Sequence, residues 1–392
     1  MQGSPVDVSL RKISGIRLRT TKIAAAVYGS ALALACQHVS AQSSVTLYGM
    51  TDLSIRYLTN ADAKNDSRLF MANGAVINSH VGLQGSEDLG GGLKGVFQLE
   101  SNINPQNGSL GDSGRLFDST ADVGLSGDIG TLTFGRQTTP LFNQLVFTYD
   151  PLTYANYPEN SWLPYALGAG LTVDNSIKYV GQFGGLYIGA IYSFGNNYES
   201  SGAGGFSGQV PGHMGAGNML GLLASYAHGP LNIGAGVQQV SDNSNNKQTL
   251  YHVGIRYVFS QTKLYLGYMH SQDNTGLVDT LLAEQPIPDI GQLKNTGRID
   301  DGPFAGVSWQ VSGPLLLTGA FYYDHMRNAV TADGSLGTGT RYTAVALAEY
   351  ALSKRTEVYG TVDFNRVSGT ATVESPGRSN QTGVAMGMRS FF

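Results

Sequence analysis

Short segments in which every second residue is apolar recur along most of this chain. In the clearest of them, residues 250–259, one face carries Tyr251, Val253, Ile255, Tyr257 and Phe259. Successive side chains of a β-strand point to opposite faces, so this pattern predicts strands with one apolar and one polar face. A segment of this length, tilted by about 40°, covers about 20 Å along the normal, close to the apolar band of a membrane-spanning barrel. The segments Val45–Tyr57 and Thr356–Arg366 repeat the pattern.

The connections between these segments alternate between short and long. Short ones lie at residues 127–130, 228–230, 260–261, 312–314 and 353–354. Long polar or glycine-rich ones lie at residues 195–217, 241–248, 272–300 and 327–339. Short periplasmic turns at one end and long external loops at the other are typical of a transmembrane β-barrel. If each strand has one short and one long connection to its neighbours, the chain between residues 44 and 392 forms 16 strands. The sequence therefore predicts an all-β, 16-stranded antiparallel transmembrane barrel.

Composition excludes several other classes. The 392 residues include 53 glycines, and only 13% are charged, about half the usual share. This argues against helix bundles and coiled coils, and a hydrophobic fraction of 41% argues against disorder. No apolar run after residue 41 approaches 18 residues, which argues against membrane-spanning helices. The formal net charge of −4 predicts no nucleic-acid partner.

The N-terminus has the pattern of a secretory signal peptide. Basic residues precede an apolar stretch, Ile23–Ala35, and the small residues of Val39-Ser40-Ala41 follow it. We therefore expect a cleaved signal over residues 1–41 and a mature barrel domain over residues 42–392. The lone cysteine, Cys36, would leave with the signal, so the mature chain has no disulfide. Lipid attachment at Cys36 fits poorly, because Ala33 occupies a position where a bulky apolar residue is expected.

The chain lacks the common catalytic motifs. The seven histidines form no H-E-x-x-H motif, and the chain has neither a G-x-S-x-G elbow nor a phosphate-binding G-x-x-x-x-G-K-[ST] loop. We expect no catalytic residues, cofactor or metal site. Two other classes of protein are compatible with the sequence. An outer-membrane esterase or protease could unite a Ser/His pair only in space, and a secreted adhesin or soluble β-sandwich would be extracted without detergent.

Several motifs spread over the mature chain carry a family resemblance. They are Ser-Val-Thr-Leu-Tyr-Gly at residues 44–49, Gly-Ser-Glu-Asp-Leu-Gly-Gly-Gly-Leu-Lys at 85–94, Phe-Gln-Leu-Glu at 97–100, Val-Gly-Leu-Ser-Gly at 123–127, Phe-Gly-Arg-Gln at 134–137, Asp-Asn-Ser-Ile-Lys-Tyr at 174–179, and the terminal strand ending in Phe392. In these motifs the chain resembles the gram-negative trimeric general porins.

This resemblance implies passive diffusion of ions and small hydrophilic solutes through a homotrimer in the outer membrane. It implies contact with outer-membrane lipid and lipopolysaccharide. It also implies that the insertion machinery reads the terminal aromatic residue, Phe392, as an assembly signal. The third external loop, here about Thr138 to Val173, would fold into the lumen and narrow it. The alternative for that loop is a flap on the surface.

Charged side chains at the narrowest level of a water-filled pore select its ions. The acidic candidates for this constriction are Asp150 and Glu159, both on the third loop. Arg136 is the best basic candidate, and Lys94 and Arg115 are further ones. Each of these residues could instead be an ordinary lumen or rim charge, and for Lys94 and Arg115 we favour that interpretation.

The chain departs from its relatives at lumen positions where they often carry basic residues. Arginines are replaced by His80, Ser119 and Thr172, and a lysine by Gln84. The sequence therefore predicts a weak preference for cations. Histidine gains charge near pH 6.5, so the preference should shift toward anions below about pH 6. Alternatively, Arg115 or Lys178 replaces the missing basic groups in the pore, and the pore then prefers anions.

Overall fold

A computed structural model gives the fold of residues 44–74, 77–112, 114–152, 171–195 and 210–392. The predicted signal peptide and Glu159 lie outside the described residues. None of the described helices is long or apolar enough to cross a membrane.

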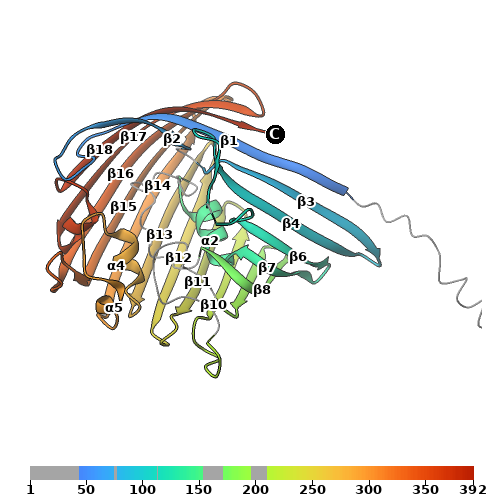
Figure 1. Cartoon of the computed structure of the whole chain (residues 1–392). Coiled ribbons are helices and arrows are strands. Elements are labelled where there is room, and N and C mark those ends of the chain that lie inside the picture. The colour runs from blue at the N-terminus through green and yellow to red at the C-terminus, as the bar shows by residue number, and fades with distance from the viewer. Residues whose placement is uncertain (1–43, 75–76, 113, 153–170, 196–209) are drawn as a thin grey trace, which may run out of the picture. The chain divides into compact units, whose positions relative to one another are not determined.

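Sixteen antiparallel strands form a closed barrel, as the alternation predicts (Figure 1). In chain order the wall consists of β1 (Ser44–Leu58), β3 (His80–Gly90), β4 (Leu93–Asn104), β6 (Thr120–Gly127), β7 (Gly130–Thr138), β8 (Thr172–Phe183), β9 (Leu186–Ser193), β10 (Met219–His228), β11 (Leu231–Ser241), β12 (Lys247–Phe259), β13 (Thr262–Asp273), β14 (Arg298–Gln310), β15 (Leu315–Val330), β16 (Leu336–Ala351), β17 (Thr356–Gly369) and β18 (Asn380–Phe391). Two short strands, β2 (Arg68–Asn73) and β5 (Ser109–Leu110), lie within long connections.

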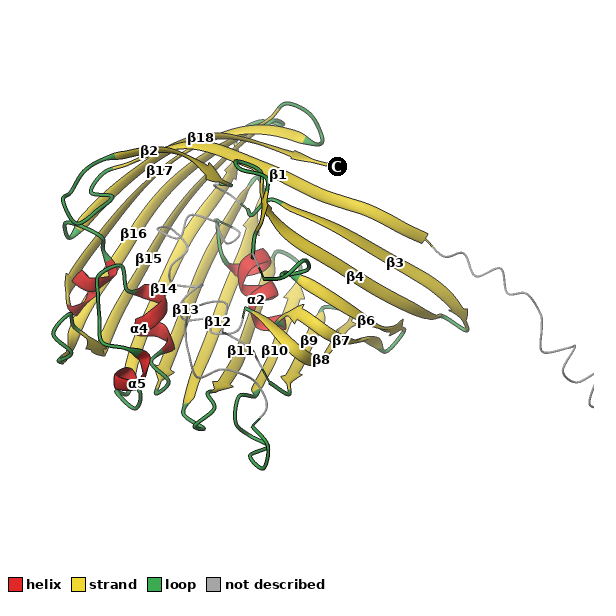
Figure 2. Ribbon diagram, in the orientation of Figure 1, coloured by secondary structure: helices red, strands yellow, loops and turns green. Residues whose placement is uncertain are grey.

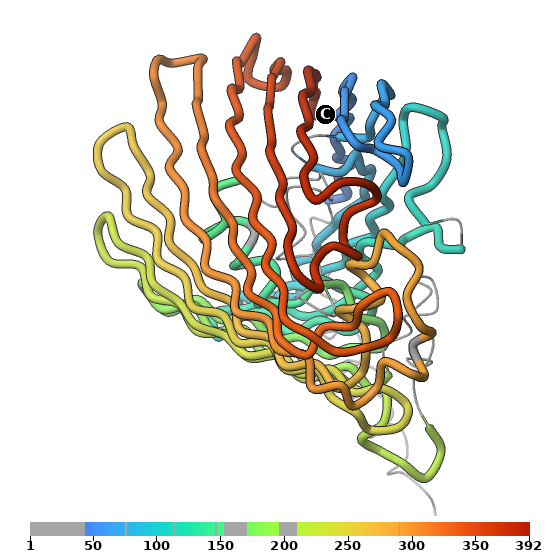
Figure 3. The backbone as a smooth tube through the Cα atoms, turned by 90° about the vertical axis from the view of Figure 1, so that its left-hand side faces the viewer, coloured from blue at the N-terminus to red at the C-terminus, as the bar shows by residue number. Residues whose placement is uncertain are grey.

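The first and last strands close the barrel (Figure 3). They pair from Met50 opposite Phe391 to Leu58 opposite Gly383. Two further backbone bonds extend the ladder: the Phe392 N–H donates to the Gly49 carbonyl at 3.0 Å, and the Gly49 N–H donates back at 3.2 Å. Closure is required in lipid, where each unpaired backbone group costs several kcal/mol. The pairing of the terminal strands meets this requirement.

The alternation within each strand separates an outer face from an inner face. In β12, Tyr251 and Phe259 on the outer face are 51% and 69% exposed, whereas His252 on the inner face is 1% exposed. The same parity holds in β18, where Val384, Met386 and Met388 are exposed on the outside. The outer face is therefore apolar, as in known membrane barrels, and the inner face carries polar and small residues together with some buried apolar ones.

Short turns lie at one end of the barrel and longer connections at the other. The connection between β11 and β12 spans only residues 242–246, and that between β15 and β16 only residues 331–335. Both are shorter than the sequence predicts, because polar residues such as Gln248 still pair in the ladder, here opposite Val240. The connection between β13 and β14 is long, as predicted, and contains α4 (Leu277–Leu282) and α5 (Ile290–Leu293).

A buried ion cluster joins two connections at the long-loop end. Arg298, at the start of β14, is 1% exposed. Its guanidinium lies 2.7 Å from Asp279 of α4, 2.7 Å from Asp300, and 3.0 Å from Glu374 of η3 (Thr370–Glu374). Burial raises the pKa of the Asp279 and Glu374 carboxyls, and the charge of Arg298 opposes that rise. One guanidinium thus fixes both connections to the barrel wall.

Replacing Arg298 by Met should lower the free energy of unfolding of the detergent-solubilised barrel by about 3–5 kcal/mol, because it leaves buried carboxylates unpaired. Heat- and urea-induced loss of the folded, fast-migrating species measures this. Arg366→Met is the matched control, since Arg366 is exposed on the outer face of β17 and its loss should cost no more than about 0.5 kcal/mol. Equal destabilisation by the two variants would contradict this role for the cluster.

Candidate functional site

The first part of the third external loop lies inside the barrel. It forms α2 (Pro140–Gln144) and the π-helical turn η1 (Leu145–Tyr149). The α2 helix contacts β9, β10 and β11, and η1 contacts β12 and β13 (Figure 2). For residues 139–152 the inward-folded loop is therefore confirmed, and the surface flap is wrong. The remainder of the predicted loop, through residue 170, lies outside the described residues.

Local sequence and apolar packing both favour this path. The Thr139 hydroxyl accepts a hydrogen bond from the Phe142 N–H at 3.2 Å and caps α2, whose first residue is a proline. Leu141, Leu145 and Leu152 are at most 2% exposed. They join a buried cluster with inner-wall side chains that include Leu223, Leu250, Met269, Phe304 and Tyr322. The loop thus covers an apolar stripe of the wall that would otherwise face water.

Glycines in the wall make room for this loop. A Cβ at Gly254 would lie 2.4 Å from the Tyr149 ring, and one at Gly234 would lie 2.2 Å from the Tyr149 hydroxyl. A Cβ at Gly306 would lie 2.4 Å from Pro151. The Tyr149 hydroxyl donates to Asn232 Oδ1 at 2.7 Å, which fixes the ring over the glycines. The absence of side chains at these glycines therefore allows the loop to pack inside the barrel.

Replacing Gly254 by Val should displace the loop and increase single-channel conductance in planar bilayers, because the new side chain occupies the space of Tyr149. Gly360→Val is the control: Gly360 also lies within a strand, and its nearest neighbour to an added Cβ is 3.9 Å away. We expect the control to conduct like the unmodified protein. A Gly254→Val channel of unchanged conductance and noise would show that the loop does not depend on this contact.

Asp150, an acidic candidate for the constriction, is buried at 1% exposure. Its Oδ1 accepts hydrogen bonds from the Tyr322 hydroxyl of β15 and, at 3.1 Å, from the Leu152 N–H. The carboxylate therefore ties the loop to the wall and is not presented to open solvent.

The basic candidates Arg115 and Arg136 come together on one acid, Asp174. Their guanidinium nitrogens lie 3.0 Å and 2.6 Å from Asp174 Oδ1. Arg136 Nε also donates to the Asp118 carbonyl at 2.6 Å. A register shift between Gly135 and Gln137 interrupts the strict alternation of β7 at this point. Both arginines are therefore partly neutralised beside the base of the inward loop.

His80 lies on the inner face of β3, close to an acidic network. Its Nδ1 lies 2.9 Å from the Asn78 carbonyl, and its ring packs edge-on against Tyr48 with centroids 6.3 Å apart. The Tyr48 hydroxyl donates to Glu100 at 2.8 Å, and Gln98 donates to the same hydroxyl at 2.7 Å. The structure thus connects His80, through Tyr48, to the carboxylate of Glu100, which the sequence did not single out as a site residue.

Lys94 occupies a different position from the other candidates. It is exposed near the start of β4, opposite Asp88 and next to the short turn after β3. This is the short-turn rim of the barrel, which agrees with the interpretation of Lys94 as an ordinary rim charge.

Other arginines of the interior also have carboxylate partners. Arg56 of β1 lies 2.8 Å from Asp363 of β17, with both side chains at most 1% exposed. Arg389 of β18 lies 2.7 Å from Glu349 of β16. Sequence reasoning singled out neither pair, nor Asp174. Arg56 and Asp363 both point inward, and their strands, β1 and β17, each pair with β18, so opposite charge combined with inward parity could have found this pair.

Comparisons with known proteins agree with this architecture. The model of a family described as "Gram-negative porin" matches residues 25–370. An outer membrane porin protein of Bordetella pertussis is 33% identical over 262 residues, which are 59% of this chain and 65% of that protein, just under two thirds. Outer membrane porin protein 32 of Delftia acidovorans is 29% identical over 376 residues, covering 90% of this chain and 95% of that protein.

Solved structures share the fold. An anion-selective porin from Comamonas acidovorans superposes with a TM-score of 0.68 at 24% identity, covering 90% of this chain and all of that one. A trimer form of the outer membrane protein OmpT of Vibrio cholerae gives a TM-score of 0.60 at 14% identity, covering 89% of this chain and 99% of that one. With a family match over most of its length and a closed barrel around an inward loop, the chain belongs to the Gram-negative porin family.

Proposed function

We propose that this protein is a general diffusion porin, through which ions and small hydrophilic solutes cross the outer membrane passively. The main support for this proposal is that the inner wall has an apolar side, covered by the loop, and a polar side. The inward loop covers the apolar side over β9–β13, and the facing wall of β1–β8 keeps polar side chains such as Gln84, Gln98 and Asp122. Water and solutes would pass along that polar wall. We expect no turnover of generic esters or peptides.

We further propose that the pore prefers cations weakly, with a constriction formed by the inward loop and the wall around His80 and Arg136. The support is the pairing of its basic groups. Arg115 and Arg136 share Asp174, and Lys178 lies within electrostatic reach of Asp122. Focusing by low-dielectric walls makes such local charges more important than the net total. Glu159 is a further acidic candidate in this proposal.

Zero-current potentials under a KCl gradient test the selectivity. We expect a small cation preference at pH 7.5 that moves toward anions at pH 5, because histidine gains a positive charge in this range. In His80→Gln, an uncharged variant, the shift should become smaller. A clear anion preference at pH 7.5, or an equal shift with and without His80, would refute the charge assignment and leave the channel itself untouched.

We propose that the mature protein is a homotrimer in contact with lipid and lipopolysaccharide. We also propose that removal of residues 1–41 produces the mature chain. The trimer form of a structural neighbour supports the assembly. A monomer mass in detergent-corrected light scattering would contradict the trimer.

N-terminal sequencing of the outer-membrane protein should begin at Gln42, and any retained upstream residues would contradict the cleavage site.

Phe392 is proposed as a signal for the insertion machinery. Its backbone also adds two hydrogen bonds to barrel closure, so the two roles must be separated. Phe392→Gly keeps those bonds and removes the aromatic ring. We expect folded barrel in the outer membrane to fall several-fold, while refolding of the purified variant into detergent stays close to that of the unmodified protein. Parallel losses in both assays would mean that the ring acts on stability alone.

A further inference from the structure

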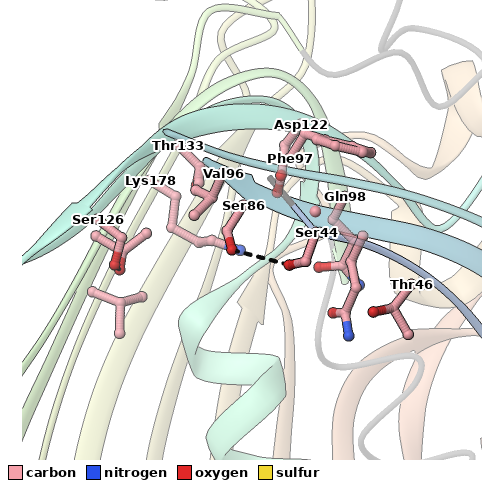
Figure 4. A pocket seen from close by; sticks show the side chains of 14 residues that line it. Ser44, Thr46, Ser86, Val96, Phe97, Gln98, Asp122, Ser126, Thr133 and Lys178 are labelled. Atoms are coloured by element: carbon pink, nitrogen blue, oxygen red, sulfur yellow. Dashed lines mark hydrogen bonds between the residues drawn. The ribbon is translucent and has the colours of Figure 1, made fainter. Parts of the chain in front are cut away.

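A polar recess lies in the inner wall of β1, β3, β4, β6, β7 and β8 (Figure 4). Its volume is about 450 Å³, within the range of about 300–1,000 Å³ for small-molecule sites. Neutral hydrogen-bonding side chains dominate its lining: Ser44, Thr46, Gln84, Ser86, Gln98, Ser126, Thr131 and Thr133. The charged residues in the lining are Asp122 and Lys178.

Short side chains create the recess. Six of its lining residues are serines or threonines, whose short side chains leave space beside the longer side chains of Gln98 and Lys178 (Figure 4). Thr46 and Gln84 lie opposite each other on paired strands, and both are exposed. The Ser44 and Ser86 hydroxyls lie 3.5 Å apart, at the limit of a hydrogen bond, so both retain capacity for a further partner.

The recess lies at the short-turn end of the barrel. Ser126 and Thr131 flank the turn between β6 and β7, and their hydroxyls are 2.8 Å apart. Short turns are periplasmic in barrels of this kind. The described residues of the inward loop, in contrast, pack on β9–β13, and none of them lines the recess. A solute that has passed the loop therefore meets the recess before it leaves the pore.

The charges of the recess balance. Asp122 and Lys178 attract each other, and the Lys178 ammonium also donates to the Thr138 carbonyl at 3.2 Å. A free ion would compete with this pairing and find no net charge to hold it. A neutral solute with many hydroxyl groups, by contrast, can exchange hydrogen bonds with water for hydrogen bonds with the hydroxyl and amide side chains.

We propose that this recess is a subsite for neutral polyhydroxylated solutes, with Gln84 and Thr46 as the residues that bind them. The inference rests on the proposed channel function and names a solute class that the pore retains transiently. It predicts brief interruptions of ion current when such a solute occupies the recess.

Glucose is the probe, added to the protein reconstituted in planar bilayers, with a polyethylene glycol of matched size as the reference polymer. Glucose should interrupt the current for longer than the polymer does. The mean interruption should shorten about three- to tenfold in Gln84→Leu and in the shape-matched Thr46→Val, since each loses hydrogen bonds worth about 0.5–1.5 kcal/mol. Gln182→Leu, the same change on β8 outside the recess, is the control and should leave the interruption unchanged.

Equal interruptions in all four proteins would overturn the subsite, and so would longer interruptions by the zwitterion glycine betaine than by glucose. Thr46→Val keeps the test decisive even if Gln84→Leu folds poorly. A protein that forms no ion-conducting steps at all would refute the proposed channel function, an outcome separate from loss of glucose binding.

Discussion

Backbone hydrogen bonding in lipid is the constraint on which the rest of this structure depends. A strand in the bilayer has no water to pair with its N–H and C=O groups, so the sheet must close on itself. The pairing of β1 with β18, extended to the last residue by Gly49 and Phe392, meets that requirement. Once the ladder is closed, strict alternation sends every second side chain to the lipid and leaves the others to shape an interior.

That interior is divided into two kinds of wall. Over β9–β13, glycines and apolar residues receive the inward loop, with Tyr149 over Gly254 and Asp150 bound by Tyr322. Over β1–β8 the wall contains a recess lined mainly by polar side chains. The loop therefore shields an apolar stripe from water, and in the proposed channel the same packing would confine solutes to the polar side. Ion pairs such as Arg56 with Asp363 reinforce the wall without leaving a bare charge.

Much of this fold could be predicted from the sequence because it follows from local periodicity. The alternation around Tyr251–Phe259 is such a signal, carried by contiguous residues, whereas the inward third loop is implied by the resemblance to the general porins. The roles of individual charges could not be predicted, because they depend on partners far apart in the chain. The sequence makes Asp150 a candidate acid for the constriction, but it gives no sign that this residue is buried and bonded to Tyr322, 172 residues away. Arg136 and Arg115 meet through Asp174, next to a register shift that no periodic pattern anticipates. Glu159 remains a prediction.

The most direct test of the central claim is stepwise conductance of the purified mature protein in a planar bilayer, with neutral polymers of increasing size on both sides. A water-filled barrel narrowed by its inward loop should give discrete, uniform steps. Small polymers that enter the pore should reduce the step height, and polymers above a sharp size limit should leave it unchanged. Absence of steps, or step heights that fall equally with polymers of every size, would contradict the account.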